Sequence, residues 1–327
     1  MKVVITGGAG FLGQRLARKI LEQGSLTDSE GRESAVTSLT LVDVVAANDF
    51  GDARVQSVVG DIADTALISE VIGADVDSVF HLAAIVSGQA EADFDLGMRI
   101  NLDATRALLD ACRAHGRRPK FIFTSSVAVF GGKLPDVVQD TTALDPRSSY
   151  GVQKAIGELL VNEYSRRGFI DGRVLRLPTI SVRPGKPNKA ASSFASGIIR
   201  EPLNGQEAVC PVPPETRLWL LSPRAATVAL LKGHALPAQS LQDGRTINLP
   251  GLSVSVADMI AALKRVAGED ALRHLRWERD ATVERIVGGW PAAWDTRRAR
   301  ALGLEGDEDF DSIVRAYVED DLPGGLA

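Results

Sequence analysis

The sequence predicts an α/β protein in which a doubly wound parallel sheet is followed by a smaller C-terminal α/β region. Two observations support this fold class. Short aliphatic runs without polar alternation, which are typical of strands buried on both faces, recur through the first half of the chain. Segments with helical periodicity separate these runs, and this order is expected when helices connect parallel strands.

The expected elements follow this alternation. Strands are predicted at 2–6, 39–45, 55–59, 79–84, 121–125 and 174–177, and helices at 11–23, 98–115 and 150–166. From Pro178 to Pro214, seven prolines break the chain into loops. Helices return at 225–234 and 256–266, the second between a capping Ser255 and a terminating Gly268. The polar stretch 25–38 is expected to be a surface loop.

Composition excludes several classes of protein. The 37 basic and 42 acidic residues give a net charge of −5, which argues against nucleic acid as a partner. No apolar run approaches the length of a membrane span, and the N-terminus lacks a signal-peptide pattern. Two cysteines cannot form a disulfide framework, so we expect a reducing, cytoplasmic location. Cys112 and His115 have no second ligand pair beside them, so no metal is expected.

A glycine-rich turn connects the first predicted strand to the first predicted helix. Its glycines stand at Gly7, Gly10 and Gly13. Gly7 suits a tight turn, Gly10 allows the backbone to approach a phosphate, and Gly13 allows close packing of helix and strand. Amide groups at a helix N-terminus bind anions, so the turn predicts a site for a dinucleotide pyrophosphate.

Acidic residues follow the next two strands. Asp43 ends the second strand, where a carboxylate accepts hydrogen bonds from the adenosine ribose and repels a 2′-phosphate. It lies 30 positions after Gly13, and the insert at 25–38 accounts for the extra length. The sequence therefore favours NAD over NADP. Asp61 and Ile62, after the third strand, are candidates to cover the adenine ring.

A phenol and an ammonium group are predicted on one helical face. Tyr150 and Lys154 are four residues apart, and a neighbouring cation favours the phenolate and lowers the pKa of the tyrosine. Ser125 and Ser126 follow Thr124 at the end of a strand, where doubly wound folds bind their ligands. Hydroxyl, phenolate and ammonium groups beside a dinucleotide form a proton relay suited to alcohol oxidation.

These motifs, with His81-Leu82-Ala83-Ala84, Asn101 and the segment 124–131, resemble the extended short-chain dehydrogenase/reductase family in order and spacing over nearly the whole chain. The resemblance implies a Rossmann domain over 1–177, with a return segment near 222–250, and a substrate domain over 178–327. It implies Tyr150 as the acid/base, Lys154 at the nicotinamide ribose, Ser126 as the catalytic hydroxyl, and a homodimer joined through helices 98–115 and 150–166. Further implied NAD contacts are Phe11, Leu12, Leu82, Ala83, Ala84, Asn101 and Pro178.

The substrate is expected to be a small anion. The stretch 172–200 has six basic residues and no acidic one, which suits a carboxylate or a phosphate. The loops at 85–89 and 186–193 are similar to those of the D-erythronate dehydrogenase subgroup, which implies oxidation of the C2 hydroxyl of this four-carbon sugar acid to 2-oxo-D-erythronate. The candidate substrate residues are Ser87, Ser125, Ser126, Tyr150, Thr179, Arg183 and Arg217.

Two other functions remain open from the sequence. A nucleotide-sugar 4-epimerase or dehydratase of the same family would hold its NAD tightly and release no net NADH. However, such enzymes commonly carry an asparagine after the strand that ends at Leu177, where this chain has Pro178. A regulatory protein that senses NAD without chemistry is the second alternative, and such proteins generally lack the pair formed here by Tyr150 and Lys154.

Overall fold

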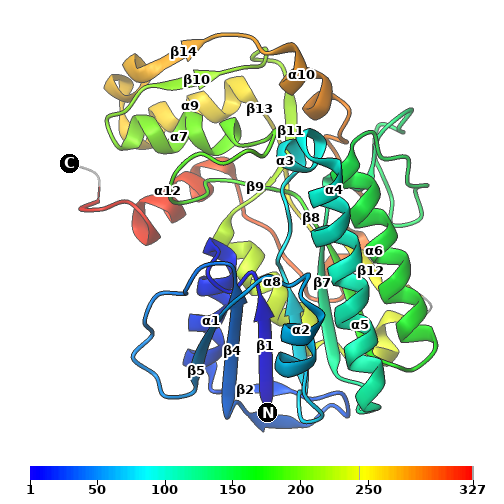
Figure 1. Cartoon of the computed structure of the whole chain (residues 1–327). Coiled ribbons are helices and arrows are strands. Elements are labelled where there is room, and N and C mark those ends of the chain that lie inside the picture. Colours follow the sequence, from blue (N-terminus) through cyan, green and yellow to red (C-terminus); the bar gives the residue numbers. More distant parts are fainter. Residues whose placement is uncertain (243, 326–327) are drawn as a thin grey trace.

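Seven parallel strands form the central sheet of the protein, in the order β12-β8-β7-β6-β1-β4-β5 (Figure 1). The computed structural model describes residues 1–242 and 244–325. The strands are β1 (Lys2–Thr6), β4 (Ser38–Asp43), β5 (Val55–Val59), β6 (Ser78–His81), β7 (Lys120–Ser126), β8 (Asp171–Leu177) and β12 (Thr246–Asn248). The order reverses between β1 and β6, so the fold is Rossmann-like and has its ligand crevice at the carboxyl ends of these two strands.

Helices cover both faces of this sheet. On one face, α1 (Phe11–Gln23) and α8 (Pro223–Ala235) bury Leu16 and Leu230 in one apolar cluster with residues of β1 and β4. On the other face, Ile68, Leu108 and Val161 pack around the sheet residues in a second cluster. They belong to α2 (Thr65–Val71), α5 (Ala104–His115) and α6 (Ser149–Arg166). The predicted helix over 98–115 starts as a π-helical segment, Met98–Asp103.

The C-terminal half builds a second layer above the carboxyl ends of the strands (Figure 1). Two small sheets, β13-β11-β9 and β10-β14, pack with α7 and α9 around a separate apolar cluster. Between these elements the chain returns to the large sheet, where α8 packs on one face and β12 pairs with β8. The elements are β9 (Thr179–Ile180), α7 (Phe194–Leu203), β10 (Ala208–Cys210), β11 (Arg217–Leu221), β13 (Leu252–Ser255), α9 (Val256–Ala267), β14 (Leu275–Trp277), α10 (Ala281–Gly288), α11 (Arg297–Ala301) and α12 (Phe310–Asp320).

Local signals in the sequence predicted one helix well and one connection wrongly. Ser255 caps α9 through a capping box with Asp258, and Gly268 ends the helix, which confirms both assignments. The prediction of a surface loop at 25–38 is wrong, because β2 (Ser25–Thr27) and β3 (Glu33–Ala35) form an antiparallel hairpin there. Two apolar side chains within this polar stretch, Leu26 and Val36, are buried in the cluster beneath α1 and anchor the hairpin.

No helix in the described part of the chain is long and apolar enough to span a membrane.

Candidate active site

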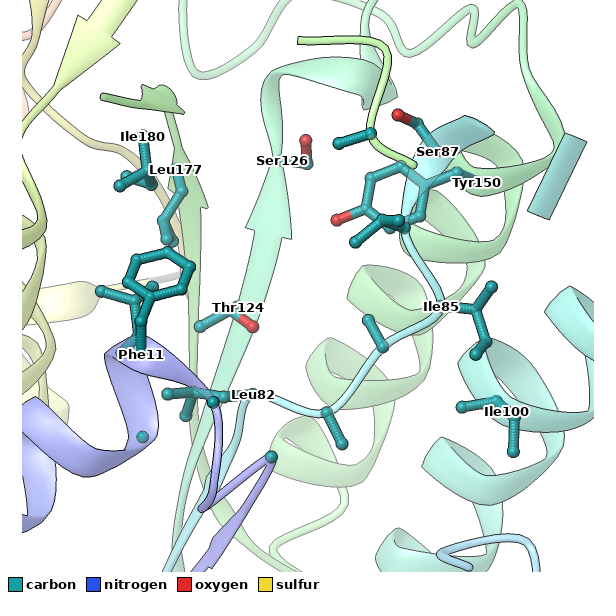
Figure 2. Close-up of a pocket in the computed structure, with 18 of the residues that line it drawn as sticks. Phe11, Leu82, Ile85, Ser87, Ile100, Thr124, Ser126, Tyr150, Leu177 and Ile180 are labelled. Atoms are coloured by element: carbon teal, nitrogen blue, oxygen red, sulfur yellow. The ribbon is translucent and has the colours of Figure 1, made fainter. Parts of the chain in front are cut away.

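A cavity opens at the carboxyl ends of β1, β6 and β7, between the large sheet and the C-terminal layer (Figure 2). Most of the residues predicted to bind cofactor or substrate line it. They are Gly7, Gly10, Phe11, Leu12, Gly13, Asp43, Asp61, Ile62, Leu82, Ala83, Ala84, Ser87, Ser125, Ser126, Tyr150, Pro178, Thr179 and Arg183. Three predicted residues are not among the cavity-lining residues, namely Asn101, Lys154 and Arg217.

The glycine-rich turn has the backbone geometry that a dinucleotide requires. Gly7 has φ +72°, and a Cβ on it would lie 2.8 Å from the Ala83 nitrogen. A Cβ on Gly13 would lie 2.2 Å from the Gly7 carbonyl oxygen, so α1 can approach β1 only with glycine there. Gly10 begins α1 without a side-chain cap, which leaves the first-turn amides to a ligand in the cavity. These features fit the pyrophosphate of NAD.

The two acidic candidates differ in their surroundings. Asp43 accepts hydrogen bonds from the backbone amides of Ala9, at 3.1 Å, and Val44, at 2.8 Å, so it is fixed beside the glycine-rich turn. Asp61 instead forms an ion pair with Arg99 at 2.6 Å. Burial acts to raise the pKa of its carboxyl group, but hydrogen bonds from the Ala63 amide and from Arg99 outweigh it and lower the pKa. The sequence reasoning missed Arg99, whose contact with Asp61 spans 38 residues and leaves no local pattern.

Tyr150 stands at the start of α6, which Ser148 caps through a hydrogen bond from the Gly151 amide at 3.2 Å. Figure 2 shows its hydroxyl pointing into the cavity toward the end of β7, which carries Ser126. Burial raises the pKa of Tyr150 to about 12, although hydrogen bonding with Ser126 and the charge of Arg183 oppose this rise. The expected lowering of this pKa is therefore wrong in this structure, because removing the phenol from water outweighs the nearby charges.

Lys154 lies one helical turn further along α6 and is buried beside the cavity rather than in its lining. Its Nζ atom lies 4.7 Å from the centre of the Phe123 ring and 5.8 Å from that of the Tyr150 ring. Burial lowers the pKa of Lys154 to about 7, while the charge of Glu158 opposes this change.

A buried polar network lies behind the catalytic candidates. Ser125 donates a hydrogen bond to Glu158 at 2.5 Å, and Arg176 binds the same carboxylate through Nε at 2.9 Å and Nη2 at 2.7 Å. Ser125 therefore ties β7 to α6 and β8, in addition to lining the cavity. Glu158 was missed in the sequence, where its only signal is a position four residues after Lys154 on the same helical face.

The Asn101 side chain forms hydrogen bonds with the backbone of the chain segment that follows β6. Its amide donates to the Ile85 carbonyl oxygen at 3.0 Å and to Gln153 Oε1 at 2.7 Å, and it accepts from the Ile85 amide at 2.8 Å. These bonds join the cavity-lining segment 82–86 to α6. Asn101 therefore contributes to the site by holding its wall in place.

Three of the six basic residues in the stretch 172–200 are paired with carboxylates, contrary to the appearance of the stretch in the sequence. Arg173 pairs with Asp171 at 2.7 Å, Arg176 with Glu158, and Arg200 with Glu201 at 2.6 Å. The sequence count missed these pairs because all three carboxylates lie outside the counted window. Asp171 and Glu201 flank it directly, and Glu158 lies on α6. Arg183 is the member of the stretch that lines the cavity.

Arg217 does not reach the cavity. Its side chain is half exposed, and it donates to the Ser253 carbonyl oxygen at 2.8 Å and lies 4.0 Å from Asp258. It therefore joins β11 to β13 at a surface away from Tyr150.

A loop from the C-terminal half closes one side of the cavity. Ser87, at the start of α3 (Ser87–Ala92), accepts a hydrogen bond from the Ala191 amide at 3.1 Å, so it also fixes this loop. A Cβ on Gly88 would lie 2.2 Å from the Lys189 carbonyl oxygen, which shows how closely the loop approaches α3. Trp290, which no pattern in the sequence singled out, also lines the cavity.

The fold, the glycine-rich turn and the hydroxyl groups opposite it define a dinucleotide-dependent oxidoreductase. The chain belongs to the NAD dependent epimerase/dehydratase family, whose profile matches residues 3–219. No group of three or more potential metal ligands occurs in the described residues.

Similar proteins cover the whole length of the chain. A D-erythronate dehydrogenase of Cupriavidus necator is 64% identical over 100% of both chains. A D-erythronate dehydrogenase of Haemophilus influenzae is 48% identical, over 98% of this chain and 100% of its own. The crystal structure of a nucleoside-diphosphate-sugar epimerase from Agrobacterium tumefaciens, 44% identical, superposes with a TM-score of 0.93 over 100% of this chain and 96% of its own.

Proposed function

We propose that this protein oxidises the C2 hydroxyl of D-erythronate to 2-oxo-D-erythronate with NAD. The observation that carries this proposal is Arg183, whose Nη2 atom is buried without a hydrogen-bond partner in the described structure and belongs to a side chain that lines the cavity of Tyr150. A buried guanidinium nitrogen without a partner is costly, and a carboxylate would satisfy it. The two relatives named D-erythronate dehydrogenase support the choice of acid.

The residues around the cavity support NAD as the cofactor. The uncapped amides after Gly10 would hold the pyrophosphate. The Asp43 carboxylate would accept hydrogen bonds from the ribose hydroxyls and repel a 2′-phosphate. Ile62, Leu82 and Pro178 would contribute apolar contacts. When bound, NAD supplies the acceptor for the hydride that leaves C2.

The proposed roles of the other side chains follow from their positions. Tyr150 takes the proton of the C2 hydroxyl, and Ser126 orients that hydroxyl. Lys154, buried one helical turn after Tyr150, would bind the nicotinamide ribose. Arg183 holds the carboxylate, and Thr179 contacts the polyol chain. We leave Arg217 out of the substrate set because its guanidinium bonds to Ser253.

The same proposal covers the roles of the two domains, the oligomeric state and the cellular location. Residues 1–177 with the return segment near 222–250 would hold the cofactor, and the rest of 178–327 would close over the substrate. Two exposed apolar residues on α6, Val152 and Leu159, support a homodimer joined through α5 and α6. We keep a cytoplasmic location as part of the proposal, in keeping with the two buried free thiols.

The test is to incubate the protein with NAD and a panel of acids, namely D-erythronate, D-threonate, L-tartrate and D-glycerate, while recording NADH absorbance. We expect NADH to form fastest with D-erythronate, in proportion to the 2-oxo acid produced. The relative named nucleoside-diphosphate-sugar epimerase makes the second candidate worth a parallel assay, with UDP-glucose and dTDP-glucose. No NADH from any acid, with conversion of a nucleotide sugar, would replace our proposal by that one.

A further inference from the structure

The backbone and the side chain of Arg183 are both held by one face of α7. Ser196 and Arg200 are four residues apart on this helix, so they lie on the same face. The Ser196 hydroxyl accepts from the Arg183 amide at 3.0 Å and from its Nε at 3.4 Å. Arg200 donates to the Arg183 carbonyl oxygen at 2.7 Å. Both polar groups of the Arg183 backbone and the base of its guanidinium group are therefore fixed.

The hydrogen-bonding capacity of Ser196 is fully used in this arrangement. A hydroxyl has one proton to donate and two lone pairs to accept with. The proton points to the Ile180 carbonyl oxygen at 3.5 Å, and the lone pairs receive the two Arg183 N–H groups. Ser196 is fully buried, so no water competes for these bonds.

The charge of Arg183 is available to a ligand. Arg99, the other cation that lines the cavity, is paired with Asp61, and Arg200 is neutralised by Glu201. Arg183 has no carboxylate partner within 4.0 Å in the described part of the chain. Because Nε is bound to Ser196, the edge formed by the two Nη groups is the one left for an incoming anion.

We propose that Ser196 is a positioning residue for substrate selection, which holds the Arg183 guanidinium so that its Nη edge receives the carboxylate of the sugar acid. This inference rests on the proposed function. It adds Ser196 as a residue on which the preference for an acidic over a neutral substrate depends. Without the Ser196 hydroxyl, Nε is free to compete for the anion and the guanidinium plane can turn. The two parallel hydrogen bonds to the carboxylate are then lost, while neutral substrates are unaffected.

Steady-state kinetics of Ser196→Ala tests this inference with D-erythronate and its neutral amide, D-erythronamide. We expect KM for D-erythronate to rise about tenfold or more, since a charge-assisted bidentate contact is weakened, while kcat stays within about twofold. KM for the amide should not change. Ser165→Ala is the matched control, because Ser165 is a buried serine that also bonds to backbone groups but lies outside the cavity. Equal changes in KM for acid and amide, or no change for either, would refute the role of Ser196.

Two further measurements keep the test decisive. Ser196→Cys keeps the shape of the side chain, with a slightly larger atom, and replaces the hydroxyl with a poor acceptor, so it should show the same selective change if the alanine variant does not fold. If the wild type forms no NADH with D-erythronate, calorimetric titration with the four acids of the panel decides the inference separately from the function. Weaker binding of an acid to Ser196→Ala than to wild type would then support it. Equal binding, or no binding of any of the acids to wild type, would refute it.

Discussion

At the scale of single residues, burial and charge compete for the protonation state of Tyr150. Burial raises its pKa to about 12, so the phenolate fraction is very small near neutrality. Below that pKa, the phenolate fraction grows about tenfold for each unit of pH. We therefore expect kcat/KM for D-erythronate to increase steadily between pH 6 and 9, measured by initial rates in a constant-ionic-strength buffer.

Tyr150→Phe provides the variant for this experiment. Loss of a general base typically lowers kcat by about 10²- to 10⁴-fold, whereas NAD affinity should stay unchanged. Tyr164→Phe is the control, because Tyr164 is on the same helix but its hydroxyl bonds to Asp110 at the surface. A flat pH profile in the wild type, or normal turnover in Tyr150→Phe, would remove Tyr150 from its proposed role.

At the scale of elements, the approach of α1 to β1 depends on one glycine. In Gly13→Ala the new methyl group would meet the Gly7 carbonyl oxygen at 2.2 Å, so α1 must move away and its first-turn amides move with it. We expect the dissociation constant for NAD, measured by calorimetry, to rise by about tenfold or more, since those amides hold the pyrophosphate. Gly288→Ala in α10, where a methyl group meets only open space, should bind NAD normally. Normal NAD binding by Gly13→Ala would show that the turn does not hold the dinucleotide.

The sequence predicted those parts of the fold and site that depend on local patterns. The glycine-rich turn, Asp43 at the end of β4 and the start of α6 before Tyr150 all follow from short-range spacing. Contacts between distant segments were not predictable in this way. Glu158 binds Ser125 and Arg176 across three elements, and the carboxylates that pair with three of the basic residues in 172–200 lie outside that stretch. The rise in the pKa of Tyr150 depends on burial, which no spacing reveals.

At the scale of the whole molecule, the exposed face of α6 bears on assembly. Leu159 is 66% exposed and Val152 is 42% exposed, and their spacing of seven residues places them on one side of the helix. If this face joins two subunits, Leu159→Asp should raise the dimer dissociation constant by at least about tenfold in sedimentation equilibrium, because it buries a charge. Val228→Asp on α8 offers a control with a similarly exposed residue. A wild-type protein that sediments as a monomer would contradict the proposed homodimer.

The chain returns to the large sheet through α8 and β12, and this return limits where the protein can be joined to a related enzyme in a chimera. A gene fusion with a single junction near residue 178 would take α8 and β12 away together with the C-terminal layer. The face of the sheet beneath α8 would then be exposed, and β8 would lose its outer neighbour. Substrate preference therefore cannot be transferred between such enzymes as one contiguous block. A working chimera needs at least two further junctions that keep 223–248 with the N-terminal parent, or an exchange confined to the loops around Arg183.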